Sequence, residues 1–392
     1  MSLTPSALHF LKSGTRTAGH FGFQDLERLK KSAAEHERPE DKPVPVHKAS
    51  ANDRRIDALH GMLTSGVCAY IDNELYRSGE PALFYTVGTV PRTGDTALSL
   101  QVVGVEKSIA ETLLIQTTRA ILEDLGYEEQ LVRINSLGDA ESTARYIREL
   151  TNYLRKRIED LPAPARELMK EHVFSALNYL VEKEHELGMR SPSPLEYLSD
   201  PSRKHFRGIV EFLEMSEARY EIDPRLLGHD RCYSEALFSV EPQDERAEGE
   251  EAPIFVRGGR YNAFVSTISK TEVSAAGAVM VLRGKKSPKN TPQVRTKKPS
   301  VFVVQLGFGP KIRSLLLVSE LRRAGVAVLQ DVVSDSLQSQ LQKAEGYGAK
   351  YAVIIGQKEY VEGNVILRNL GARSQEHLPI STLASYLKRA TK

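Results

Sequence analysis

The sequence predicts an α/β protein, and three stretches of the chain carry that prediction. Residues 82–90 and 98–105 are rich in β-branched and aromatic residues and flank a short turn at 93–95, which is typical of an antiparallel hairpin. Residues 140–220 have a mostly helical pattern. After residue 300, short apolar runs alternate strictly with helical stretches, so this part is expected to form a compact α/β domain with a parallel or mixed sheet.

Composition limits the classes of protein to which the chain can belong. Its 392 residues suffice for two or three domains, and 41% hydrophobic with 27% charged residues is ordinary for a soluble globular protein. The two cysteines, Cys68 and Cys232, lie far apart without metal-ligand spacing, so neither a disulfide framework nor a metal site is expected. No apolar run is long enough to span a membrane, and the N-terminus lacks the pattern of a signal peptide. We therefore expect a cytoplasmic protein.

The elements before residue 283 follow from local pattern. Residues 1–55 are polar, contain Pro39, Pro43 and Pro45, and are interpreted as a poorly specified lead-in. A folded domain is expected over 56–282. Its elements after residue 55 are expected to be a helix at 55–76, the hairpin, a helix at 108–125 ending at Gly126, a strand at 131–135, the helical insertion at about 140–215, and strands at both ends of 235–256 around an acidic loop.

A basic segment separates this domain from the rest of the chain. Residues 283–299 contain no acid and three prolines, which is compatible with a mobile linker or with a strap that contacts phosphates. The candidate nucleic-acid contacts in it are Lys285, Lys286, Lys289, Arg295, Lys297 and Lys298. The domain over 300–392 is expected to contain strands at 301–304, 326–329, 351–356 and 365–368 and helices at 311–323, 336–345 and 382–389.

Six residues, Arg257-Gly258-Gly259-Arg260-Tyr261-Asn262, follow the apolar strand 253–256. Glycines let a backbone approach a small ligand closely, and arginines grip a carboxylate or a phosphate with two hydrogen bonds. An ordinary surface turn with solvated arginines is the alternative interpretation. On the first interpretation, Arg257, Gly258, Gly259, Arg260 and Tyr261 bind a substrate.

Five stretches, in this order along the chain, resemble histidyl-tRNA synthetase, a class II aminoacyl-tRNA synthetase. They are Phe84–Gly88 with Val103–Glu106, Ile134–Gly138, Tyr220–Leu226, Arg257–Tyr261, and the domain from residue 300 onward with its segments 321–325 and 354–359. The resemblance implies that 56–282 is a catalytic-core domain with an antiparallel class II sheet and a helical insertion, and that an anticodon-binding-like domain follows at the C-terminal end. It also implies tRNA as a partner, a homodimer, and ATP and Mg²⁺ if ligase activity is retained.

The residues that carry the family's chemistry are only partly present. Arg92 aligns with a motif 2 arginine and is the candidate catalytic residue, although the glutamate that should follow it is missing. Glu106 aligns with a residue that holds an ammonium group; a strand-end carboxylate facing water is the alternative. Tyr233 matches a tyrosine of the histidine-specific signature. The family's α-phosphate arginine falls at Gly228 and its motif 3 arginine at Gly284.

These substitutions lead to three hypotheses about function. The first is a paralogue without ligase activity that binds tRNA through its C-terminal domain and needs no cofactor. The second is an active, divergent histidine–tRNA ligase that uses ATP and Mg²⁺. The third is a regulatory subunit of an ATP phosphoribosyltransferase in histidine biosynthesis. Losing one stabilising charge in such a site typically costs on the order of 10²–10³ in rate, so losing several favours the first hypothesis.

Overall fold

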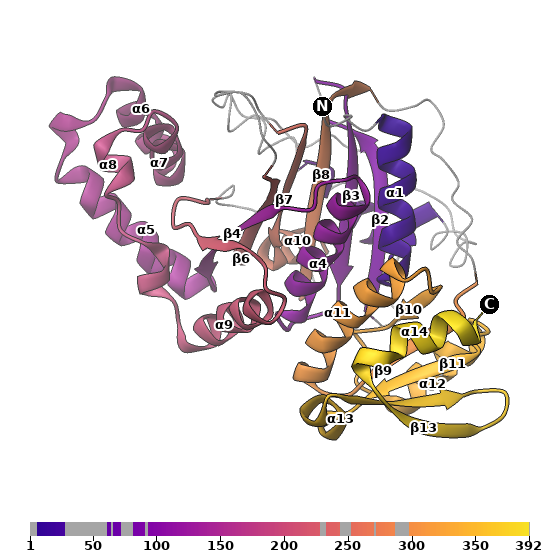
Figure 1. The fold of residues 1–392 in the computed structure, drawn as a ribbon. Coiled ribbons are helices and arrows are strands. Elements are labelled where there is room, and N and C mark those ends of the chain that lie inside the picture. The colour runs from indigo at the N-terminus through magenta and orange to yellow at the C-terminus, as the bar shows by residue number, and fades with distance from the viewer. Residues whose placement is uncertain are drawn as a thin grey trace.

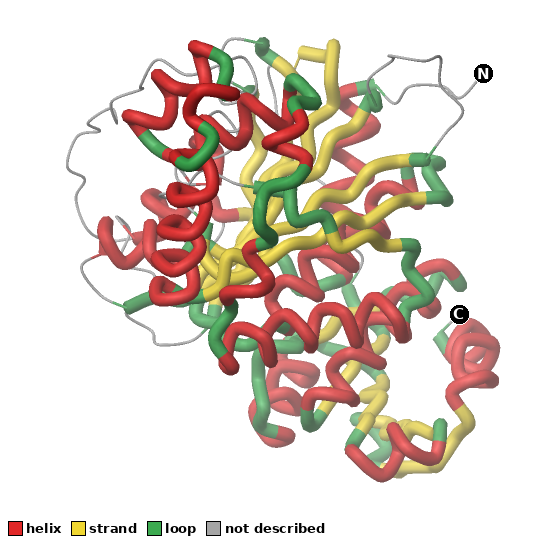
Figure 2. Tube along the Cα trace, turned by 90° about the vertical axis from the view of Figure 1, so that its left-hand side faces the viewer, coloured by secondary structure: helices red, strands yellow, loops and turns green. Residues whose placement is uncertain are grey.

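The structure is a computed structural model that describes residues 6–27, 61–63, 66–71, 81–90, 93–227, 233–243, 252–269, 272–286 and 298–391. A large sheet forms the centre of the molecule, a lobe of short helices lies beside it, and a smaller α/β unit packs below (Figure 1). Figure 2 shows the strands of the large sheet running side by side between helices. The predicted fold class is confirmed.

The central sheet has eight strands in the order β1-β2-β3-β8-β7-β6-β4-β5. Neighbouring strands are antiparallel except for the outermost pairs, β1 with β2 and β4 with β5, which are parallel. The bounds are β1 Gln24–Asp25, β2 Ala82–Thr89, β3 Asp95–Val103, β4 Gln130–Gly138, β5 Tyr220–Ile222, β6 Ser234–Pro242, β7 Ile254–Arg260 and β8 Ala275–Lys286. The predicted hairpin is therefore β2–β3.

One face of this sheet is covered by α1 (Ala7–His20), α4 (Ile109–Asp124) and α9 (Asp200–Met215), which share one apolar core with it. Helix α1 differs from the expected lead-in. Phe10 and Leu11 are fully buried, and Ser6 caps the helix by accepting a hydrogen bond from the amide of His9. The sequence gives only a weak amphipathic signal for this helix, because its buried face includes the polar residues Thr15 and Thr17. The Thr15 hydroxyl donates to the Leu11 carbonyl.

The opposite face carries a second core, which the helical lobe closes at one end. Its helices are α5 Ala140–Arg155, α6 Ala163–Glu171, α7 Val173–Glu182 and α8 Glu186–Met189, with short 3-10 turns at Ile158–Asp160 and Pro194–Tyr197. The predicted helical character of 140–215 is confirmed. Its last helix, α9, packs on the first face against α4 instead. Residues 61–63 and 66–71, from the helix expected at 55–76, are helical and cover part of the second face.

The C-terminal unit is a five-stranded sheet in the order β10-β9-β11-β12-β13. Its elements are β9 Val301–Gln305, α11 Phe308–Arg323, β10 Val328–Gln330, α12 Leu337–Gly346, β11 Tyr351–Ile355, α13 Gln357–Glu362, β12 Asn364–Asn369, β13 Ser374–Pro379 and α14 Ile380–Ala390. Every predicted element is present. The edge strand β13 was missed because its residues are mostly polar and exposed.

The two units share the first core, and polar contacts join them where α4 meets α11. The Gln116 side-chain amide donates to the Ser319 hydroxyl at 2.8 Å. Arg322, which is 8% exposed, forms an ion pair with Asp124. Strand β8 continues through Lys286, so the predicted linker at 283–299 begins as sheet. Within the described ranges, no helix is both long and apolar enough to cross a membrane.

Candidate functional site

Strand β7 divides the six-residue motif between the two faces of the sheet. Side chains alternate along a strand, so Gly258 and Arg260 face α4 and α9, whereas Arg257 and Gly259 face the second core. Tyr261, directly after the strand, is fully buried in that second core. The proposed substrate-binding residues are therefore adjacent in sequence but do not form a single cluster.

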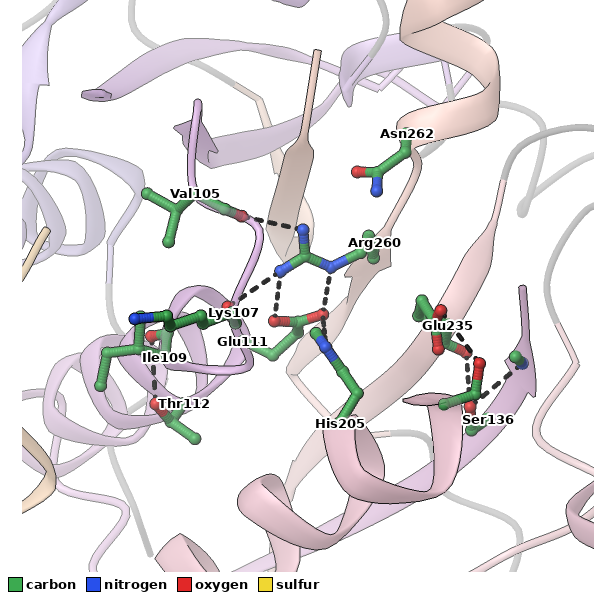
Figure 3. A network of polar contacts seen from close by, with 12 residues as sticks. Val105, Lys107, Ile109, Glu111, Thr112, Ser136, His205, Glu235, Arg260 and Asn262 are labelled. Carbon is green, nitrogen blue, oxygen red and sulfur yellow. Dashed lines mark hydrogen bonds and ion pairs between the residues drawn. The ribbon is translucent and has the colours of Figure 1, made fainter. Parts of the chain in front are cut away.

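Arg260 is the centre of a buried ion network (Figure 3). Its Nε and Nη2 atoms donate to the two carboxylate oxygens of Glu111 at 2.7 and 2.8 Å. Nη1 donates to the Val105 carbonyl at 2.8 Å, and Nη2 also donates to the Lys107 carbonyl at 3.1 Å. His205 Nε2 lies 2.8 Å from Glu111 Oε1 on the other side of the carboxylate. The network ties β7 to the start of α4 and to α9.

The charges in this network fix the ionisation of Glu111. Burial alone would raise the pKa of its carboxyl, but the charges of Arg260 and His205 and their hydrogen bonds hold the pKa well below its usual range. Burial lowers the pKa of Arg260, yet the Glu111 carboxylate outweighs it and raises that pKa above its ordinary value. Both groups are thus charged at neutral pH, and each satisfies the other. Arg260 therefore holds β7 against the start of α4, and its guanidinium points away from the second face.

On the second face, glycines allow tyrosine rings to lie against the sheet. A Cβ atom on Gly259 would lie 2.8 Å from the ring of Tyr233, and one on Gly277 would lie 3.0 Å from the hydroxyl of Tyr261. The Tyr261 hydroxyl donates to the side-chain oxygen of Gln101, whose amide donates to the Leu63 carbonyl at 2.8 Å. The four side chains of Tyr233, Tyr261, Gln101 and Leu63 are at most 5% exposed. The protein's own side chains therefore fill this part of the face.

Arg257 lies farther along the same face and lines a cleft between the sheet and α7. One of its terminal nitrogens, Nη2, donates to the Leu227 carbonyl. Burial lowers the pKa of Arg257, and the surrounding charges of Glu241 and Asp223 act in the opposite direction. Of the two motif arginines, Arg257 is the one that faces a space able to accept a ligand.

The remaining candidate residues lie apart from this face or beyond the described residues. Glu106 is exposed after the end of β3, where Gly104 has a φ of +81°. Lys285 and Lys298 are exposed on either side of the undescribed segment 287–297, and Lys286 is the last residue of β8. Arg92, Lys289, Arg295 and Lys297 lie outside the described residues. Their assignments stay predictions.

Sequence reasoning did not single out several polar residues that the fold brings to β7. They are Glu111, His205, Gln101, Arg133 and Ser239. Side chains alternate between the two faces along a strand, so the spacing of Arg257 and Arg260 in the sequence already indicates that they lie on opposite faces. No local pattern indicated their partners. In the part of the chain that the structure describes, no group of three or more His, Cys, Asp and Glu side chains is arranged to hold a metal ion.

Comparison with known proteins shows where the chain has relatives. Residues 301–390 match the family described as "Anticodon binding domain". A histidine–tRNA ligase of Geobacillus thermodenitrificans is 26% identical over 340 residues, which cover 83% of this chain and 79% of that protein. Apo histidyl-tRNA synthetase of S. aureus has a TM-score of 0.46 at 18% identity, covering 82% of this chain and 81% of that one.

A third relative is a Bacillus halodurans protein whose structure is described as an ATP phosphoribosyltransferase regulatory subunit/histidyl-tRNA synthetase. It has a TM-score of 0.41 at 13% identity and covers 91% of this chain and 97% of that one. On the sequence matches, the chain resembles histidyl-tRNA synthetases as a divergent relative with an anticodon-binding domain.

Proposed function

We propose that this protein is a histidyl-tRNA synthetase-like protein that binds tRNA through its C-terminal domain and that has a degenerate adenylation site. The match of residues 301–390 to the anticodon-binding family supports the first part. A homodimer and a cytoplasmic location are expected from the same resemblance. The proposal of a degenerate adenylation site depends on the second face of the central sheet, where a class II enzyme would form its adenylate.

The observation that carries the degenerate site is the filling of this face by core side chains. Tyr261 and Leu63 are fully buried, and Gln101 links them through the Tyr261 hydroxyl and the Leu63 carbonyl. Arg260, directly after the glycine pair, is held on the other face by Glu111. Glycines at 228 and 284 replace the two arginines that would neutralise the triphosphate. Neither glycine can supply the positive charge that phosphoryl chemistry needs at these two positions.

Titration with histidine tRNA at two salt concentrations tests the RNA-binding part. We expect binding that weakens steeply with salt, because lysine–phosphate contacts release counterions. Replacing Lys298 with glutamate should lower the salt slope by about 1 and weaken binding to any tRNA sequence about equally. Lys170→Glu, the same charge change on exposed α6, is the matched control and should leave the affinity unchanged. Absence of binding at low salt would refute tRNA binding.

Histidine-dependent pyrophosphate exchange tests the second part. Similarity to a ligase over 79% of that ligase's length favours the alternative, an active enzyme that would use ATP and Mg²⁺ with Arg92, Glu106, Arg260 and Tyr261 at its site. We expect no exchange above background. Exchange that requires histidine, ATP and Mg²⁺ would establish the alternative and overturn the degenerate site, whatever the tRNA titration shows.

A further inference from the structure

A row of three polar residues crosses neighbouring strands on the second face of the sheet. Arg133 of β4 is paired in register with Ser239 of β6, and Ser239 is paired with Arg257 of β7. Residues paired across strands point to the same face and lie about 5 Å apart. The row therefore places a serine hydroxyl between two arginines.

This row forms the floor of a cleft of about 260 Å³. Helix α7 contributes Asn178, Val181 and Glu182 to the opposite wall, and the segment after β5 contributes Asp223–Leu227 except Pro224. Phe255, two residues before Arg257, closes one side with an apolar surface. A space of this size accepts a small molecule or one group of a larger ligand, and is too small for a folded partner.

Of the three arginines that line the cleft, Arg257 alone has no ion pair among the described residues, and the carboxylates of Glu182, Asp223 and Glu241 line it as well. Arg133 forms ion pairs with Glu241 at 2.6 Å and with Glu221 at 3.3 Å, and Arg225 at the rim forms one with Asp223 at 3.2 Å. Among the described residues, Arg257 has no carboxylate partner, and its Nε has no hydrogen-bond partner. A half-buried guanidinium that is held only by a carbonyl has donors to spare for an anion.

Ser239 supplies an independent observation. Its residue is 2% exposed, it lines the cleft, and its hydroxyl has no hydrogen-bond partner among the described residues. Buried hydroxyls in proteins are nearly always hydrogen-bonded, so an unpartnered one beside an unpaired guanidinium indicates a ligand that accepts from both. A carboxylate or a phosphate oxygen has this chemistry.

We propose that this cleft binds a small oxyanion, a carboxylate or a phosphate group, with Arg257 supplying the charge and Ser239 the second donor. Arg133, on the other side of Ser239, is already paired with Glu241 and Glu221. The site does not depend on RNA binding by the C-terminal domain. It also differs from the filled region around Tyr261, since its donors come from β6 and β7 beside α7.

Isothermal titration of the full-length protein with inorganic phosphate and, separately, with acetate, at constant ionic strength, tests the proposal. We expect saturable binding of at least one probe. Arg257→Gln should weaken it roughly tenfold to a hundredfold, as expected for a lost charged hydrogen bond, and Ser239→Ala should weaken it less. Arg155→Gln, which removes the same charge from exposed residue 155 of α5, should bind like the wild type.

Binding of phosphate alone would identify a phosphate group, binding of acetate alone a carboxylate, and binding of both a less selective oxyanion site. The proposal fails if neither probe binds, if Arg257→Gln binds as tightly as the wild type, or if Arg155→Gln loses as much affinity as Arg257→Gln. Circular dichroism establishes that each variant is folded. If Arg257→Gln does not fold, Ser239→Ala decides, and unchanged affinity in that variant overturns the proposal.

Discussion

Arg257 and Arg260 belong to the same strand and have the same chemistry, but the two faces of β7 give them different surroundings. Arg260 is 1% exposed, and all three of its nitrogens donate to Glu111 or to carbonyls of the segment before α4. Arg257 lies at a cleft and, among the residues that the structure describes, has a single carbonyl as its hydrogen-bond partner. A buried arginine whose donors are all satisfied holds the fold together, whereas one with unused donors beside open space is available to a ligand.

This difference changes how the six-residue motif is interpreted. From sequence, both arginines looked like ligand-binding donors, and the glycines between them looked like a floor. In the structure, the glycines serve packing on both faces, since a Cβ on Gly258 would lie 2.6 Å from the Gly277 carbonyl and one on Gly259 would lie 2.7 Å from the Ala236 carbonyl. We therefore assign stability to Arg260 and ligand binding to Arg257.

Replacing each arginine with methionine tests this assignment and has the largest expected effect. Arg260→Met would leave the buried Glu111 carboxylate without its main partner and should lower the free energy of unfolding by about 3–5 kcal/mol. Arg257→Met removes one hydrogen bond to a carbonyl but also a poorly compensated buried charge, so its effect should be within about 1 kcal/mol. Urea unfolding at pH 7, monitored by circular dichroism, measures both.

Equal losses in the two variants would contradict the contrast between the faces. Glu111→Gln with Arg260→Met completes a double-mutant cycle, and we expect the double variant to be much less unstable than the sum of the single variants. Additive losses would mean that the Arg260–Glu111 pair contributes no coupling.

The pH dependence of stability sharpens the same comparison. The pKa of Glu111 is lowered in the folded protein, so its ionised form stabilises the fold at pH values above its ordinary pKa of 4.5. This contribution is lost as the pH falls below 4.5 towards the folded-state pKa. The difference in unfolding free energy between the wild type and Glu111→Gln should therefore be constant from pH 7 to about 5 and should shrink below that. A difference that grows on acidification would contradict the lowered pKa.

Local patterns predicted most of the fold, because hairpins and amphipathic helices are encoded by residues close in sequence. The β2–β3 hairpin, helix α4 and the elements of the C-terminal sheet were expected nearly where they occur. Helix α1 was missed because its buried face includes threonines, which do not register as apolar. Strand β13 was missed because an exposed edge strand has little hydrophobic signal.

The candidate site was less predictable, because its partners are distant in sequence. Glu111 is 149 residues from Arg260, and it is 94 residues from His205. The neighbours of Arg257 depend on the register of β4, β6 and β7, and register across strands from separate parts of the chain has no local signature. The alternation along β7 was readable in the sequence, and it alone separates the two arginines.

The smallest expected effect concerns Glu235, a half-buried residue near the Arg260 network (Figure 3). Its φ is +55°, the Ser202 hydroxyl donates to Oε1 at 3.1 Å, and Oε2 has no hydrogen-bond partner among the described residues. Burial raises the pKa of this carboxyl above its ordinary value of 4.5. A raised carboxyl pKa means that the fold loses stability as the pH rises through the window above 4.5, because the folded form holds its proton longer than the unfolded form does.

Glu235→Gln removes the charge, keeps an acceptor for Ser202, and should stabilise the protein at pH 7 by about 1 kcal/mol. Thermal unfolding at pH 7 and at pH 4.5 measures the change, and the gain should be smaller at the lower pH, where the raised pKa keeps more of the native carboxyl protonated. Glu217→Gln is a matched control, since Glu217 also has a positive φ, of 49°, but is exposed. If both variants gain equally, the gain does not come from relief of a buried charge, because Glu217 is exposed.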